Sequence, residues 1–246
     1  MLKLQEKPRL SRVVIFLISM SAVSHVHAVT VEFQDENYEF TVEERDVVQS
    51  IADDTEIEVR KLLPSLDTDI VLVVSSSKYV IDITGEGGMA MSAGQVLWTV
   101  DHERPGGVIG IANAHLRHTL FHEFHHLVRG WLIEGGMPKN SFMVGVVSEG
   151  MATAFARDFS GEDAPWSKYP DDVDGWVYEL QSVATGDRYA EWMFLHPDGR
   201  KWIGYRAGTF LVDLAMEATG KNSADLVNVS ADEIIELGKL PRLPGA

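Results

Sequence analysis

The sequence predicts an α+β fold, with a small β-sheet and helices in the first half and a mainly helical second half. Two short segments, 69–81 and 95–100, are rich in apolar and β-branched residues, as strands are. Beyond residue 113, apolar residues recur mostly at helical spacing. Together these patterns place the sheet early in the chain and helices after it.

The first expected elements are a strand and a long helix. Apolar and polar residues alternate within 29–40, which predicts a short strand. The sequence Thr41-Val-Glu-Glu44 is a capping box, which predicts a helix that runs to about Leu63 and ends before Pro64.

Two further strands are expected on either side of a glycine-rich stretch. Segment 69–81 is apolar enough for a buried strand, and 95–100 is a second plausible one. The stretch 84–94 between them is expected to be a turn region. It does not resemble a phosphate loop, because no Gly-Lys-Ser/Thr follows it.

The second half is expected to be helical. Asn113 is a good N-cap for a helix that runs to about Leu132, and a second helix is expected over about 142–159. A loop over 161–176 follows. Later helices are expected near 173–184, 204–219 and 231–237, the last begun by the capping box Ser230-Ala-Asp-Glu233.

Residues 1–28 have the pattern of a secretory signal peptide. Basic residues precede an apolar run over 13–23, and Val26-His27-Ala28 suits cleavage after Ala28. An uncleaved membrane anchor is the alternative, but the run is shorter than the about 20 residues that span a bilayer. We therefore expect residues 29–246 to form a single exported domain, periplasmic or secreted, with no stable membrane insertion.

Composition narrows the partners and the chemistry. The formal net charge of −16 disfavours nucleic acid and anionic membranes as partners. The chain has no cysteine. Any metal must therefore be bound by histidine and carboxylate side chains.

The stretch T-L-F-H-E-F-H-H-L-V-R-G, residues 119–130, contains an H-E-x-x-H motif. His122 and His126 lie four residues apart, so on a helix both imidazoles share one face and can bind one ion. Glu123 lies beside the first histidine and can take a proton from a metal-bound water. The pattern predicts a catalytic metal site that needs a third protein ligand.

Glu149 is the expected third ligand. A histidine six residues after His126, the other common solution, is excluded because this residue is Leu132. Glu149 lies in the next predicted helix within an otherwise apolar or small-residue segment, 144–156. An unpaired carboxylate there would cost several kcal/mol to bury, and a cation would remove this cost.

Residues 119–130 and the sequence V-S-E-G-M-A-T-A-F-A at 147–156 resemble a largely uncharacterised family of predicted zinc-dependent proteases, a gluzincin-type branch of the zincins. The resemblance extends more weakly over most of the mature chain. It implies a zincin-like metallopeptidase fold and Zn²⁺ bound by His122, His126 and Glu149. It also implies that Glu123 is the general base.

The chain departs from better-known gluzincins one turn after the glutamate ligand. An acidic residue there orients a ligand histidine, whereas this chain has Thr153. A hydroxyl or a carboxylate from elsewhere is expected to replace it. His118 and His125 are rival ligands, and His118 is otherwise a rim residue or ordinary surface.

The expected reaction is peptide hydrolysis, in which the oxyanion needs a donor besides the metal. Tyr205 is the candidate, with His196 and Tyr189 as rivals. The strand over 95–100 is expected to run beside the cleft and bind extended peptide.

Two other classes of function stay open. One is a non-catalytic zinc-binding or protein-binding exported module, in which Glu123 is dispensable. The other is an inhibitor or adhesion domain that binds no metal. Among enzymes, an endopeptidase is favoured over an aminopeptidase, because the sequence has no motif for an acidic pocket that would bind the substrate amine.

Overall fold

The structure is a computed structural model that describes residues 28–92, 94–130, 141–183 and 188–238. The expected signal peptide, apart from Ala28, lies outside the described residues. Within the described part of the chain, no helix combines the length and the apolar character needed to cross a membrane.

The sheet has four strands in the order β1-β2-β4-β3. The strands are β1 (Thr30–Gln34), β2 (Val71–Ser76), β3 (Glu86–Ser92) and β4 (Gln95–Val100). β1, β2 and β4 run parallel, whereas β3 pairs antiparallel with β4. β3 is therefore an edge strand. β4 lines the cleft described below through Leu97 and Thr99, as expected, but both of its edges are paired, so it cannot bind a peptide by strand addition.

Helix α1 (Val42–Leu62) makes the crossover between the parallel strands β1 and β2. Its capping box is confirmed, because the Thr41 side chain accepts a hydrogen bond from the Glu44 amide and the Glu44 side chain accepts one from the Thr41 amide. These bonds satisfy amide groups that the first turn of a helix otherwise leaves unpaired.

The expectation of a turn over 84–94 was wrong for most of its length, because residues 86–92 form strand β3. Strand pairing uses backbone groups and needs no side chains, so a glycine-rich segment can join a sheet when its neighbour is well formed. Gly88 also has a packing role. A Cβ there would lie 2.4 Å from Thr119 Cγ2 and 2.9 Å from Glu123 Oε1, so β3 passes over the helix below at a distance that only glycine permits.

The helical segment that contains the H-E-x-x-H motif begins earlier than expected. α2 (Gly107–Ile111) passes through a turn of π-helix, η1 (Ala112–Leu116), into α3 (Arg117–Arg129). Asn113 lies inside the π-turn and is not an N-cap. The left-handed conformation of Gly106, with φ of 89°, begins the helical segment instead.

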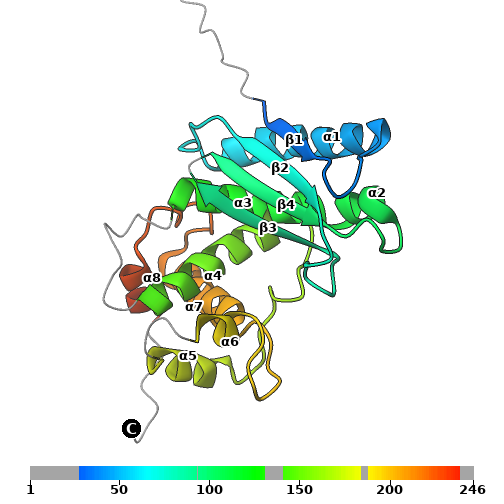
Figure 1. Cartoon of the computed structure of the whole chain (residues 1–246). Helices are drawn as coiled ribbons and strands as arrows, with labels where there is room; N and C mark the ends of the chain where they lie inside the picture. Colours follow the sequence, from blue (N-terminus) through cyan, green and yellow to red (C-terminus); the bar gives the residue numbers. More distant parts are fainter. Residues whose placement is uncertain (1–27, 93, 131–140, 184–187, 239–246) are drawn as a thin grey trace, which may run out of the picture.

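The rest of the described chain is helical and lies below the sheet in Figure 1. The helices are α4 (Ser141–Phe159), α5 (Val173–Gln181), α6 (Tyr189–Met193), α7 (Ile203–Thr219) and α8 (Ala231–Leu237). The short α6 was not expected, whereas the other helices fall close to their predicted ranges. The α+β fold class is confirmed.

Buried apolar side chains form two cores. The first lies between one face of the sheet and helices α1 and α3, with Trp98 and Phe124 among its largest members. The second lies among helices α4 to α8 and includes Val146 and Leu211. α3 and α4 pack against each other where the two cores meet.

Candidate metal centre

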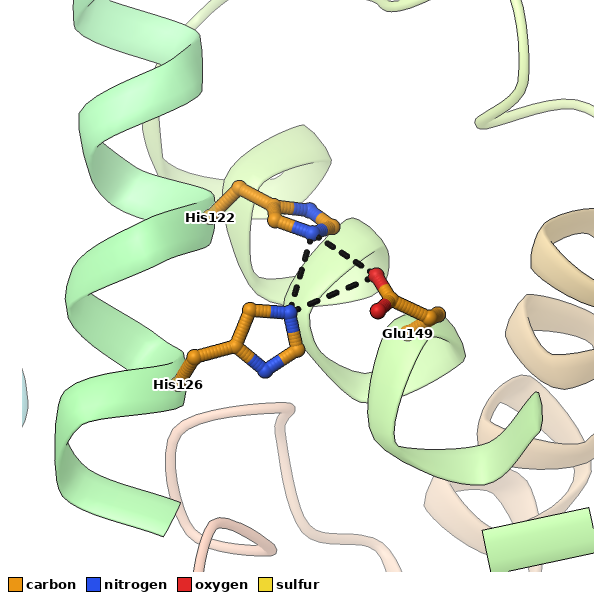
Figure 2. Close-up of side chains that lie close together, drawn as sticks. All are labelled: His122, His126 and Glu149. Atoms are coloured by element: carbon orange, nitrogen blue, oxygen red, sulfur yellow. Dashed lines mark hydrogen bonds and ion pairs between the residues drawn. The ribbon is translucent and has the colours of Figure 1, made fainter. Parts of the chain in front are cut away.

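Helix α3 presents its two motif histidines on one buried face. His122 and His126 are four residues apart, and their Nε2 atoms lie 3.1 Å from each other. Both rings project from α3 toward α4 in Figure 2. The H-E-x-x-H spacing therefore brings the two Nε2 atoms close together, as expected from the sequence.

Helix α4 supplies the third side chain. Glu149 Oε2 lies 3.1 Å from His122 Nε2 and 3.3 Å from His126 Nε2, and the three side chains point toward one another in Figure 2. Burial alone would raise the pKa of Glu149, but the adjacent His126 and His122 lower it below its ordinary value. The carboxylate is therefore charged in an otherwise apolar part of α4, where it needs a cationic partner.

The spacing of the three atoms fits a zinc ion. They are the one group of metal-binding type found among the described residues. In a tetrahedral zinc site with bonds of about 2.0–2.1 Å, neighbouring ligand atoms lie about 3.3–3.4 Å apart. The separations of 3.1, 3.1 and 3.3 Å approach this value. Two nitrogens and one carboxylate oxygen also match the ligand types of catalytic zinc sites.

The ligand histidine His126 has a polar neighbour in the residue before Glu149. The Ser148 hydroxyl lies 3.5 Å from Nδ1 of His126, at the outer limit of a hydrogen bond. Thr153, by contrast, is fully buried, and its hydroxyl has no hydrogen-bond partner in the described structure. Among the described residues, the hydroxyl near this ligand histidine is therefore that of Ser148 and not that of Thr153.

Glu123 points from α3 toward the edge strand. Its Oε2 accepts a hydrogen bond of 2.7 Å from the Ala90 amide of β3. Burial raises the pKa of Glu123, while the neighbouring His122 and His126 oppose the rise. This carboxylate lies beside the three-residue group but is not part of it.

Tyr205 reaches the same place from α7. Its ring lies 6.2 Å from the ring of His122, and its hydroxyl interacts with the Glu149 carboxylate. Burial, followed by the charge of Glu149, raises the pKa of Tyr205 well above its ordinary value, so the hydroxyl keeps its proton. Tyr189 also lines the cleft described below. His196 does not, and its Nδ1 pairs with Asp198 instead.

Two other histidines of α3 lie outside the three-residue group. His125 is fully buried and packs against Phe155 with ring centroids 5.4 Å apart. His118 is also buried, so it is not ordinary surface, and its Nδ1 lies 3.3 Å from the Ser160 hydroxyl. His118 lines a small cavity of about 60 Å³ beside the centre. Neither joins the metal-binding group.

The centre opens into a large cleft of about 1180 Å³. Its lining includes the three metal-binding side chains, Glu123 and Tyr205. Residues of β3 and of the segments 79–83 and 194–202 form much of the rest. A metal centre in a cleft of this size is accessible to a chain-like substrate.

Glu86 is a buried acid behind Glu123 that the sequence reasoning missed. Its Oε2 accepts hydrogen bonds of 2.9 Å from Trp98 Nε1 and from the Thr119 hydroxyl. Burial raises its pKa to about 7, although these two bonds partly oppose the rise. Glu86 directly precedes two glycines in a segment that was expected to be a turn, where a carboxylate is usually exposed. Recognition of this segment as a strand would have indicated a buried side chain.

Replacing Glu86 by glutamine is expected to stabilise the protein at high pH. Folding raises the pKa of Glu86 from 4.5 to about 7, so the folded state binds more protons between these values and wild-type stability falls as pH rises. Glutamine removes this loss and still accepts both hydrogen bonds. The variant should gain up to about 3 kcal/mol at pH 8 and be nearly equal to wild type at pH 4.5.

Urea unfolding at the two pH values measures this difference. A chelator is present in both cases so that metal binding does not contribute. A constant difference between the two proteins across this range would contradict the predicted titration of Glu86.

Comparison with known proteins identifies a family whose match includes these residues. A profile of a family described as "Predicted Zn-dependent protease (DUF2268)" matches residues 48–236. The match covers most of the chain and includes the whole centre. The searches of curated proteins and of solved structures give no match.

Proposed function

The chain belongs to this family of predicted zinc-dependent proteases, and we propose that it hydrolyses peptide bonds at a centre formed by His122, His126 and Glu149. The family and the zinc cofactor expected from the two motifs are thereby confirmed, and the family implies peptide or protein substrates. The observation that carries the proposed mechanism is the convergence of three ligand atoms at 3.1–3.3 Å beside the Glu123 carboxylate, within one large cleft.

Each side chain has a defined role in this mechanism. His122, His126 and Glu149 would hold a zinc ion, which would lower the pKa of a bound water to about 7 and polarise a carbonyl group. Glu123 accepts the proton of the attacking water and passes it to the leaving amine. The hydroxyl of Tyr205 donates a hydrogen bond to the developing oxyanion.

Tyr205→Phe removes only this hydroxyl, and an unchanged kcat in the variant would exclude the role of Tyr205 as oxyanion donor.

An endopeptidase is favoured over an aminopeptidase. An aminopeptidase needs a free carboxylate to bind the substrate amine, and three acidic residues are among those described as lining the cleft. Glu123 and Glu149 belong to the metal centre, and Asp82 pairs with Arg104 at 2.9 Å. Peptides with acetylated and with free amino termini should therefore be cleaved at similar internal bonds.

We also propose that the protein is exported to the periplasm or secreted and acts as a single domain over residues 29–246. The basic residues, apolar run and Ala28 at the N-terminus support this proposal. An exported protein that starts at Val29 is the expected result. Intact residues 1–28 on the active protein would oppose it.

Removal of zinc tests the proposed function directly. The purified protein should contain about one zinc per chain and cleave a mixed peptide library. Dialysis against a chelator should abolish cleavage and lower Tm by about 10 °C, because a ligand at 1,000 times its Kd contributes about 4 kcal/mol to stability. One equivalent of zinc should restore both.

The same experiment separates the other classes of function. A non-catalytic zinc module would show the stoichiometric zinc and the change in Tm without any cleavage. A protein with no metal function would show neither.

A further inference from the structure

Exposed apolar side chains gather along the cleft. The described part of the chain has nine large apolar residues that are exposed, and five of them line this cleft. The five are Tyr79, Ile83, Met89, Phe194 and Leu195, with exposed fractions from 49% to 95%. Such clustering is typical of a binding surface, because single exposed apolar residues are otherwise scattered.

One wall of the cleft is the segment 79–83. Its backbone is joined to the edge strand by a hydrogen bond of 3.0 Å from the Ile81 amide to the Glu86 carbonyl. Asp82 in the same segment pairs with Arg104. These two contacts therefore hold in place the backbone that carries the exposed side chains of Tyr79 and Ile83.

A second wall of the cleft is the turn 194–202. The Trp202 amide donates to the Phe194 carbonyl at 3.0 Å, and the His196 amide donates to the Arg200 carbonyl at 2.8 Å. Trp202 has a left-handed backbone with φ of 56°, an unfavourable conformation for a bulky residue. Strained residues of this kind concentrate at ligand-binding sites, where the surrounding structure holds them. This wall presents Phe194 and Leu195.

The edge strand β3 also lines the cleft. Its Gly87 and Gly88 carry no side chains that could block the approach of a peptide. A Cβ at Gly87 would meet nothing within 4 Å, so the face of the sheet is open at this residue. β3 is also the edge strand, and an edge strand can pair with an added peptide strand.

Fixed charge is scarce on these walls. Apart from the metal centre and Glu123, the charged residues described as lining the cleft are Asp82 and Lys201. Asp82 is already paired with Arg104. Recognition at the walls must therefore depend mainly on apolar contact.

From these features we propose that the cleft takes an extended segment of unfolded polypeptide with large apolar side chains on both sides of the scissile bond. The proposal rests on the proposed function, because it places the scissile bond at the metal centre within this cleft. Large apolar side chains are buried in folded proteins, so a segment of this kind is accessible only in a chain that has unfolded or has not yet folded.

A binding experiment tests the preference without requiring activity. Two fluorescent peptides have the same length and charge, with leucine and phenylalanine at the four central positions of one and serine and glutamine in the other. Zinc-loaded Glu123→Gln protein should bind the apolar peptide at least about 10-fold more tightly by anisotropy. Equal binding, or tighter binding of the polar peptide, would overturn the proposal.

Wall variants locate the preference. Phe194→Ser and Ile83→Ser should each weaken binding of the apolar peptide by about 10-fold and leave the weak binding of the polar peptide unchanged. Tyr178→Ser is the matched control, because Tyr178 is 40% exposed but does not line the cleft. It should bind both peptides as the parent protein does. An equal loss in Tyr178→Ser and in the wall variants would overturn the proposal.

Cleavage by the wild-type protein separates this proposal from the proposed function. Cleavage of both peptides at equal rates would leave a zinc peptidase without the apolar preference. Tight, selective binding of the apolar peptide without any cleavage would support the apolar cleft and contradict the peptidase.

Discussion

Replacing Glu123 by glutamine is expected to lower kcat by about 10²–10⁴-fold, the usual contribution of a general base. Glutamine has nearly the same shape, and its side-chain carbonyl can still accept the hydrogen bond from the Ala90 amide. It cannot accept a proton from water. The variant should therefore keep its fold, its zinc and its affinity for peptide while it loses the chemical step.

The measurement combines kcat on a cleaved library peptide with zinc content by elemental analysis. Glu217→Gln is the control, because it makes the same chemical change on the exposed surface of α7. Wild-type kcat in zinc-loaded Glu123→Gln would show that another group moves the proton. It would favour a role for Glu123 in packing against β3.

The second large effect is expected from Gly208→Ala, which should destabilise the protein by about 1–3 kcal/mol or more. A Cβ at Gly208 would lie 2.0 Å from the Val146 carbonyl oxygen, and one at Gly150 would lie 2.1 Å from the Gly208 carbonyl carbon. The backbones of α4 and α7 therefore touch at this crossing. An added methyl group must move α4 away from α7, and α4 carries Glu149, so zinc affinity should fall as well.

Urea unfolding with and without zinc measures both effects. Gly110→Ala is the control, because a Cβ there meets nothing within 4 Å and alanine is the better helix former. Gly110→Ala should match wild type or exceed it slightly. If Gly208→Ala were as stable as Gly110→Ala and bound zinc equally well, the close crossing would not position the ligand helix.

Much of the fold could be predicted because its signals are local. The capping box at Thr41 and the β-branched segment before Val100 specify their elements within a few residues. Strand β3 could not be predicted in this way. Its pairing depends on β4 and on the room that Gly88 leaves for Thr119, and neither contact is visible in a glycine-rich segment read alone.

The same distinction applies to the centre. Helical spacing alone places His122 beside His126, and the cost of burying a lone carboxylate directed attention to Glu149. The bond from Ala90 to Glu123 depends on the sheet order instead. β4 does lie beside the cleft, but the expectation that it binds extended peptide was wrong for this reason, because periodicity identifies strands but not which of them forms the edge.

The division of the apolar interior into two cores has a consequence for how this protein responds to metal loss. The imidazoles lie on a helix of the first core, whereas the carboxylate lies on α4, which packs into the second core up to Ala154 and into the first core at Phe155 and Ala156. An ion at the centre therefore joins α3 to the part of α4 that packs in the second core, between Val147 and Met151. Removal of the ion should weaken the contact between α3 and α4 before it weakens the packing of either core. Amide hydrogen exchange should therefore accelerate first along the facing surfaces of α3 and α4.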